Sequence, residues 1–341
     1  MKAINLKPFD AVLLIGFGGP NGPSEIEPFL RNVLRGRKVP AARLESITKH
    51  YQKFDGVSPI TAITMQQAAG LRARLESKEL ILPVYVGMRN WHPFLEETMS
   101  EMAIAGIKRA LALIMAPHHS YSSCGQYKQN VLQARQALQE SGHSDIEFTY
   151  VSGWHKSFGF IQANARHVEQ ARNKLDRTVR DKAKIIFTAH SIPCTMAVES
   201  RYETELKESA ALIANALGYS NWTLAYQSRS GRPEELWLEP DICDYLKNER
   251  RRGLEAAVIC PLGFTADHIE VLYDLDHEAS QVCKEIDLPM KRAASVNDDP
   301  IFLNSLADVI RQTYRKYIIG RPLQIVSLAP SKRTEPPPPA H

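Results

Sequence analysis

Short apolar runs that end in polar loops alternate with amphipathic segments along most of this 341-residue chain. The runs at residues 11–15, 79–86 and 109–115 are predicted to be buried strands. Helices are predicted at residues 25–34, 61–75 and 94–105 and in a segment that passes through Tyr127. Strands that alternate with helices favour an open parallel sheet, which binds ligands beyond the carboxyl ends of its strands.

The same alternation continues toward the C-terminus. Strands are predicted at residues 148–151, 184–188, 223–227 and 256–260, and helices at residues 161–174, 203–217, 241–251 and 300–317. The sequence therefore predicts an α/β protein with two similar Rossmann-like lobes, whose parallel sheets face a central cleft. We expect the N-terminal lobe at residues 1–160 and the C-terminal lobe at residues 161–325. The Pro-rich tail at residues 326–341 is predicted to be disordered, because its composition does not support a packed core.

The composition is that of a globular protein, with 44% hydrophobic and 23% charged residues. A net charge of +4 is mild, and we expect no nucleic-acid partner. No apolar run reaches the roughly 18–20 residues that span a bilayer, and the first ten residues lack the core of a signal peptide. We therefore expect a cytoplasmic protein with at most peripheral membrane contact. The five cysteines include no Cys-x-x-Cys pair, so neither an iron–sulfur cluster nor another tightly bound cofactor is expected.

The first predicted strand runs into a glycine-rich turn, Gly16-Phe17-Gly18-Gly19-Pro20. A strand, a glycine turn and a helix start can together bind an anion. This spacing, however, matches neither the dinucleotide-binding motif nor the P-loop. The turn is better explained as a place where the backbone approaches a flat, bulky group.

The helix predicted after the strand at residues 256–260 concentrates carboxylates. Glu270, Asp274 and Glu278 occupy positions i, i+4 and i+8, and Asp267 lies close to the same line. Like charges at this spacing destabilise a helix by about 0.2–0.5 kcal/mol per pair, so the row makes sense if a cation passes along it. The alternative is a solvated acidic face on which Asp267 and Glu270 form a capping box.

His190 follows the predicted strand at residues 184–188, where the working side chains of parallel sheets gather. Taken alone, a histidine in a polar loop is more often a hydrogen-bonded structural residue. His190 and the carboxylate row, however, follow strands of the same lobe, so both are expected at one edge of one sheet. An imidazole opposite carboxylates suits a divalent first-row metal, and the small number of ligands suits an ion that is released.

Six motifs, in this order, resemble those of the ferrochelatase family. They are Leu13-Leu14-Ile15-Gly16-Phe17-Gly18-Gly19-Pro20, Gly56-Val57-Ser58-Pro59-Ile60, Ala189-His190-Ser191-Ile192-Pro193, Gln227-Ser228-Arg229 with Trp237-Leu238-Glu239-Pro240, Phe264-Thr265-Ala266-Asp267-His268-Ile269-Glu270 and Asn297-Asp298-Asp299-Pro300. The resemblance covers residues 10–320. It implies two chelatase-type lobes that insert Fe²⁺ into a porphyrin in heme biosynthesis, with porphyrin and Fe²⁺ as the partners.

The resemblance also implies roles for individual residues. His190 and Glu270 match the catalytic pair at the insertion centre, where the metal is bound. Asp274 and Glu278 match an acidic relay or secondary metal site, along which metal ions or protons move. The positions that correspond to porphyrin contacts are Phe17, His50, Tyr51, Ser58 and Tyr127.

The motifs resemble the coproporphyrin III branch of the family more than the protoporphyrin IX branch. Coproporphyrin III carries four propionates instead of two, and Arg35 and Arg37 are candidate partners for them. Phe17 replaces a tyrosine that can ligate iron in that branch, and Leu34 and His50 replace arginines. Coproporphyrin III is the favoured substrate and protoporphyrin IX the alternative. A non-catalytic porphyrin or heme carrier and a cobalt chelatase are further alternatives on the same fold.

Overall fold

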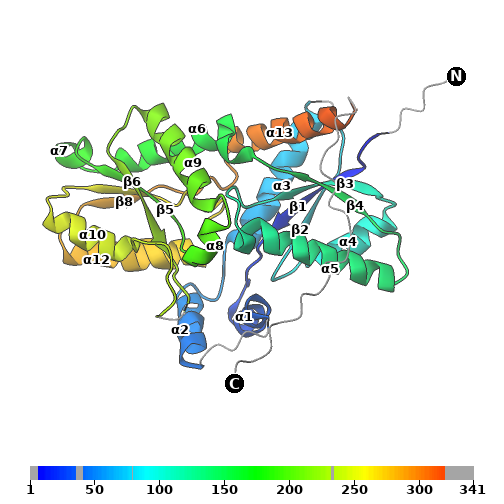
Figure 1. Ribbon diagram of the computed structural model, residues 1–341, viewed down its shortest axis with the longest axis horizontal. Helices are drawn as coiled ribbons and strands as arrows, with labels where there is room; N and C mark the ends of the chain where they lie inside the picture. Colours follow the sequence, from blue (N-terminus) through cyan, green and yellow to red (C-terminus); the bar gives the residue numbers. More distant parts are fainter. Residues whose placement is uncertain (1–6, 36–40, 79, 232–233, 319–341) are drawn as a thin grey trace.

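The structure is a computed structural model that describes residues 7–35, 41–78, 80–231 and 234–318. Two lobes lie side by side in Figure 1, and each is a parallel sheet flanked by helices. The predicted α/β class with two parallel sheets is thus confirmed. The tail at residues 326–341 and the candidate cation Arg37 lie outside the described residues.

The first sheet has the strand order β2-β1-β3-β4, and all neighbouring strands are parallel. Its strands are β1 (Ala11–Gly16), β2 (Val84–Met88), β3 (Arg109–Ile114) and β4 (Glu147–Val151). The second sheet has the order β6-β5-β7-β8, also parallel. Its strands are β5 (Lys184–His190), β6 (Trp222–Gln227), β7 (Ala257–Cys260) and β8 (Met290–Arg292).

Both sheets follow the same path, in which the first strand has the second on one side and the third on the other. The loops that leave the first and third strands therefore diverge, and ligands of open α/β sheets bind at such a switch point. In the second sheet this point lies between β5 and β7. Strand β8 was not predicted, because it has only three residues, two of them basic, and none of the three is fully buried.

The helices cover the sheets and the connections between them. In the N-terminal lobe they are α1 (Ile26–Leu34), α2 (Ala41–Gln52), α3 (Ile60–Glu76), α4 (Leu95–Ile104) and α5 (Gln126–Glu140), with short helical turns at Pro23–Glu25, Tyr121–Gly125 and Trp154–Lys156. The others are α6 (Phe158–Arg172), α7 (Arg177–Arg180), α8 (Cys194–Val198), α9 (Tyr202–Leu217), α10 (Ile242–Arg251), α11 (Ile269–Val271), the π-helical segment Leu272–Ala279, α12 (Ser280–Glu285) and α13 (Pro300–Ile318). Within the described ranges, no helix combines the length and apolar character that a bilayer crossing requires.

Neighbouring residues of β1 point into different apolar clusters. Val12 and Leu14 join one cluster, and Leu13 and Ile15 join another, all four with 0% exposure. Because both faces of the sheet are covered, the strand is a continuous apolar run without polar alternation. The cluster with Val12 and Leu14 also includes residues of β5, β7, α6 and α13. The two lobes therefore share one core.

Hydrogen bonds also connect the two lobes near the carboxyl ends of β3 and β7. The side chain of Gln67 on α3 is fully buried, and its Nε2 donates to the carbonyl oxygens of Thr265 at 2.9 Å and Asn297 at 2.8 Å. The hydroxyl of Thr265 donates to the carbonyl oxygen of Met115 at 2.9 Å, just beyond β3. These bonds fix the loop that follows β7 against the N-terminal lobe.

Helix α13 returns to the N-terminal lobe and packs between α6 and α3. The carboxylate of Asp299 accepts hydrogen bonds from the first backbone N–H groups of this helix, on Ile301 and Phe302. Asp299 also pairs with Arg166 and His167 of α6. The Asn-Asp-Asp-Pro motif therefore begins the helix and attaches it to its neighbour.

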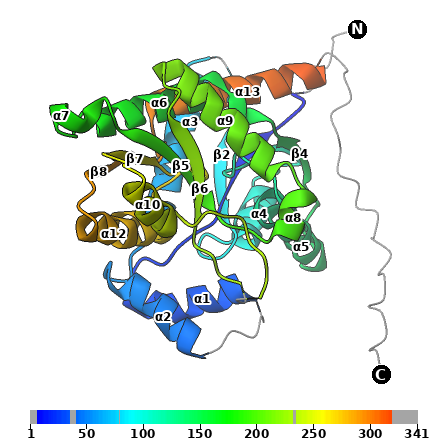
Figure 2. The ribbon, with the colours of Figure 1, turned by 60° about the vertical axis from the view of Figure 1, so that its left-hand side comes forward.

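Helices α1 and α2 form a small layer outside the two sheets, at the lower edge of Figure 2. They enclose an apolar cluster of their own, in which Phe29, Leu30 and Trp91 are buried and Tyr51 is partly buried. This cluster is separate from the core that the lobes share, so α1 and α2 are held by fewer buried contacts than the sheet helices. Helix α2 was not predicted from the sequence.

We expect Gln67→Leu to lower the free energy of unfolding by about 2–4 kcal/mol, because the carbonyl groups of Thr265 and Asn297 would lose a buried donor. The neighbouring Gln66 is exposed on the same helix, so Gln66→Leu is the matched control and should change stability by less than about 0.5 kcal/mol. Urea unfolding of both variants checks this. Equal effects of the two substitutions would contradict the role of Gln67.

Candidate active site

His190 is the last residue of β5, at the switch point of the second sheet. Its Nδ1 lies against the carbonyl oxygen of Ser191, which can only accept a hydrogen bond. In the neutral imidazole Nδ1 therefore carries the hydrogen, and Nε2 keeps its lone pair. Nε2 lies 4.0 Å from Oε2 of Glu270, and the two side chains are 31% and 39% exposed. His190 is thus oriented as a proton acceptor or a metal ligand.

Glu270 belongs to α11, in the segment that follows β7. Nε2 of His268, a nearly buried residue, lies 3.4 Å from Oε2 of Glu270. Burial alone would raise the pKa of Glu270, but the contact with His268 and the charges of His190 and His268 lower it to about 2. The carboxylate is therefore ionised at neutral pH, between two imidazoles.

Three tyrosines from different helices are affected by the charge of this carboxylate. Tyr51 lies on α2, Tyr127 on α5 and Tyr202 on α9. Burial and, to a smaller extent, the negative charge of Glu270 raise the pKa of Tyr51. The pKa of Tyr202 is raised by burial and by the charges of Tyr226 and Glu270. The charge of Glu270 therefore reaches side chains of both lobes.

Tyr127 is buried on α5, and the guanidinium of Arg89 lies 5.6 Å from its ring centre. Burial raises the pKa of Tyr127 to about 12, although Arg89 opposes this effect; Glu270 adds to it. The guanidinium of Arg35 donates to the carbonyl oxygen of Arg89 at 2.7 Å. The candidate cation Arg35 is therefore attached to the backbone next to Tyr127.

Asp274 lies on the π-helical segment, a rare conformation that occurs frequently at functional sites. Its Oδ2 accepts hydrogen bonds from the hydroxyl of Ser228 and from Nε2 of Gln227, at 3.4 Å in the second case. Burial raises the pKa of Asp274 to about 7; the bond from Ser228 opposes this shift, and the charges of Glu270 and Glu278 increase it. Glu278 is exposed on the same helix. The three carboxylates of the predicted row thus influence one another electrostatically.

The predicted capping box is wrong. The residue that precedes α11 is His268, and the carboxylate of Asp267 does not point along the helix. It accepts hydrogen bonds from Arg292 at 2.9 Å and from the amide of Asn297 at 2.9 Å. Arg292 also binds Asp276. Arg292 therefore pairs with two carboxylates outside the row of Glu270, Asp274 and Glu278.

The remaining predicted contacts lie on the N-terminal lobe. Phe17 follows β1 and packs edge-on against Phe29, with 6.4 Å between ring centres. His50 stacks on Tyr273 of the π-helical segment, with ring centres 3.6 Å apart. Ser58 is buried, and its backbone N–H donates to the carbonyl oxygen of Pro20 at 2.8 Å.

Close contacts within the protein also account for glycine at two positions of the glycine-rich turn. Gly18 has a φ of 81°, and a Cβ atom there would lie 2.9 Å from the backbone nitrogen of Trp91. A Cβ atom on Gly19 would lie 2.7 Å from the Cβ of Ser58. The glycines are thus required by close contacts within the N-terminal lobe itself.

Sequence reasoning did not single out His268, Gln227 and Ser228 as site residues. All three belong to the quoted motifs, and Gln227 and Ser228 lie at a strand end, which is the signal that could have identified them. Ser228 has a φ of 62°, a left-handed conformation that costs a serine on the order of 1 kcal/mol. This backbone conformation occurs where the hydroxyl reaches Asp274.

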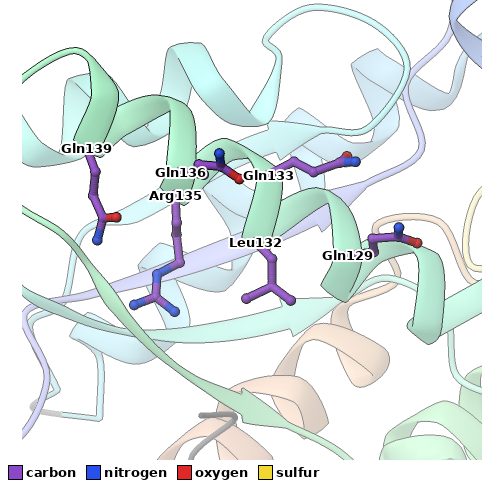
Figure 3. Close-up of a pocket in the computed structure, with 6 residues that line it drawn as sticks. All are labelled: Gln129, Leu132, Gln133, Arg135, Gln136 and Gln139. Atoms are coloured by element: carbon purple, nitrogen blue, oxygen red, sulfur yellow. The ribbon is translucent and has the colours of Figure 1, made fainter. Parts of the chain in front are cut away.

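Two hollows lined by described residues contain none of these site residues. The one drawn in Figure 3 lies along α5 and is lined by Gln129, Leu132, Gln133, Arg135, Gln136 and Gln139. The guanidinium of Arg135 in this hollow already donates two hydrogen bonds to the carboxylate of Asp145. A smaller hollow lies beyond β3 and β4, next to His119 and Cys124. The chemistry of His190 and Glu270 rests on side-chain geometry and not on either hollow.

Comparison with known proteins extends the resemblance of the motifs to nearly the whole chain. The sequence model of the Ferrochelatase family matches residues 9–314. The chain is 41% identical to a ferrochelatase of Rhodopirellula baltica over 312 residues, which cover 91% of this chain and 88% of the relative. It is 39% identical over 320 residues to the coproporphyrin III ferrochelatase of Corynebacterium glutamicum, and this match covers 92% of this chain and 86% of the relative. For the coproporphyrin III ferrochelatase of Mycolicibacterium smegmatis the identity is 40% over 305 residues, covering 89% of each chain.

A solved structure shows the same fold. The structure described as SirB from Bacillus subtilis with Fe³⁺ has a TM-score of 0.56 and 10% identity, and the match covers 93% of this chain and all of that one. At this identity the likeness concerns the fold alone. The family match and the relatives near 40% identity, by contrast, span the segments that carry His190, Glu270 and the tyrosines. The chain therefore belongs to the ferrochelatase family.

Proposed function

We propose that this protein inserts Fe²⁺ into coproporphyrin III. The observation that carries the proposal is the position of His190 Nε2, which keeps its lone pair, 4.0 Å from the ionised carboxylate of Glu270. A porphyrin loses two pyrrole protons as a metal enters, while the metal sheds its water. The reaction needs a base and an anionic partner for the metal at one place, and these two side chains supply them.

His190 acts as the base in this proposal. Because Nδ1 donates to the carbonyl oxygen of Ser191, the ring is fixed in the tautomer that can accept a pyrrole proton at Nε2. The imidazolium that forms faces Glu270, whose negative charge stabilises it. Asp274 and Glu278 continue from Glu270 along the π-helical segment as the path for the metal ion or the released protons.

Porphyrin contacts come from the N-terminal lobe. Tyr51 and Tyr127 stay protonated at neutral pH, because burial raises their pKa, and their hydroxyl groups can donate to propionates. Phe17, His50 and Ser58 complete the proposed contact set. Coproporphyrin III is favoured because relatives of that name share 39–40% identity with most of this chain. Arg35 and Arg89, close to Tyr127, supply cations for the additional propionates.

The decisive experiment is the turnover of both porphyrins by the purified protein under anaerobic conditions with Fe²⁺. We expect the absorption spectrum of metallated porphyrin to develop, and kcat/KM to be at least about tenfold higher for coproporphyrin III than for protoporphyrin IX. If the protein binds porphyrin but inserts no metal, it is a porphyrin carrier and not an enzyme. A preference for protoporphyrin IX would overturn the assignment of the substrate. A preference for Co²⁺ over Fe²⁺ would overturn the assignment of the metal.

His190→Ala should retain porphyrin binding and lower kcat for iron insertion by about 10²–10⁴-fold, because the base is removed while Tyr51 and Tyr127 remain. Fluorescence titration with coproporphyrin III measures binding, and the absorption assay measures insertion. His143 follows α5, away from these residues in the fold, so His143→Ala controls for the loss of an imidazole. Near-normal insertion by His190→Ala would show that another group is the base.

The pKa of Asp274 predicts how stability depends on pH. Since the pKa in the folded state is raised to about 7, the folded protein binds this proton more tightly than the unfolded chain. The resulting stabilisation is complete below the unfolded pKa of about 3.9 and is lost as the pH rises through about 7. Asp274→Asn should therefore gain stability relative to the unmodified protein as the pH rises from about 4 to about 7. Urea unfolding at several pH values checks this, and a constant difference would contradict it.

A further inference from the structure

Two side-chain contacts connect α2 to the π-helical segment of the other lobe. The ring of His50 stacks on that of Tyr273, with an interplanar angle of 12°. One residue beyond the end of α2, Nζ of Lys53 lies against Nε2 of His277 and 5.9 Å from the ring centre of Tyr273. His50 and Lys53 are about one helical turn apart, as are Tyr273 and His277. We name these four residues the clasp.

The clasp contacts the helix that carries the acidic row. Tyr273 directly precedes Asp274, and His277 directly precedes Glu278. On the other side, Tyr51 lies between the two clasp residues of the N-terminal lobe, and the charge of Glu270 reaches it. The clasp therefore determines how the predicted porphyrin contact Tyr51 lies relative to the insertion centre.

The clasp matters because, among the described residues, the apolar contacts of α2 are those of a small cluster. The small apolar cluster beneath α1 and α2 is separate from the core that the two lobes share. Within the described part of the chain, the ammonium group of Lys53 meets the imidazole of His277 and the face of Tyr273. An ammonium group can donate only to an imidazole nitrogen with a free lone pair. The contact is therefore a directional hydrogen bond that fixes Lys53 relative to His277, and not an attraction between opposite charges.

We propose that the clasp is a positioning device for the porphyrin. By holding α2 against the π-helical segment, the four clasp residues keep Tyr51 within reach of the charge of Glu270 and thereby stabilise the bound macrocycle. This inference rests on the proposed function. It predicts that loss of the clasp weakens porphyrin binding and leaves the chemical step at His190 intact, because the interaction acts equally on ground state and transition state.

The test compares Lys53→Met with two matched variants. Lys49 lies one turn earlier on α2, exposed and paired with Glu45 at 2.7 Å, so Lys49→Met removes the same charge without touching the clasp. Lys53→Arg keeps a donor for His277. In fluorescence titrations with coproporphyrin III and no metal, we expect Lys53→Met to raise the Kd about three- to tenfold. The Kd of Lys49→Met and of Lys53→Arg should stay within about twofold of the unmodified protein.

Turnover separates positioning from chemistry. Lys53→Met should raise the KM for coproporphyrin III by the same factor as the Kd and leave kcat within about twofold. Tyr273→Leu removes the stacked ring and should act in the same direction, whereas Tyr273→Phe keeps the ring and should restore binding. A large fall in kcat, tighter porphyrin binding or an equal effect of Lys49→Met would each overturn the inference.

Hydrogen exchange provides a readout that requires neither porphyrin nor metal. In Lys53→Met and Tyr273→Leu, the backbone amides of α2 should exchange about three- to tenfold faster, while those of α3 stay unchanged. Unchanged exchange in α2 would overturn the clasp even if iron insertion proceeds normally. If the unmodified protein fails to insert Fe²⁺ while the α2 amides respond as expected, the proposed function fails and the clasp stands as a structural device.

Discussion

The apolar core shared by the two sheets is the interaction on which the rest of this structure depends. Alternate residues of β1 and β5 point into it, and α6 and α13 close it. Since a continuous core resists rotation of one lobe against the other, loops from both sheets keep fixed positions relative to each other. The buried amide of Gln67 donates hydrogen bonds to two carbonyl groups in the loops around the acidic helix and so fixes how these loops lie against the N-terminal lobe. Glu270 and the tyrosines can therefore meet without being neighbours in sequence.

Two carboxylates four residues apart on one helical segment have opposite pKa shifts, and their neighbours explain why. Glu270 lies next to two imidazoles, which outweigh the cost of burial and keep it ionised. Asp274 has the uncharged partners Ser228 and Gln227 and stands between two other carboxylates, so burial dominates and its pKa rises. A metal ion or a proton that moves along this row would meet groups of different charge at each position.

Rigid and loosely held parts are distributed in a way that suits a large, flat substrate. The groups proposed for chemistry come from the ends of β5, β6 and β7, which are bonded into a sheet. The groups proposed to contact porphyrin come in part from α2, which rests on a small separate cluster and on the clasp. An adjustment of α2 to a bound porphyrin would then leave the positions of His190 and Glu270 unaffected.

The sequence by itself determined the two parallel sheets, the position of His190 at a strand end and the row of Glu270, Asp274 and Glu278. These features follow from local patterns of apolar runs, turns and helical spacing, and the ordered motifs indicated the family. The tertiary structure alone decided that Asp267 binds Arg292 instead of capping a helix, and that His268 holds Glu270 ionised. It also decided that the charge of Glu270 reaches Tyr51 and that Lys53 meets His277. Each of these depends on contacts whose geometry is set by packing of the whole chain, which no local pattern of residues encodes.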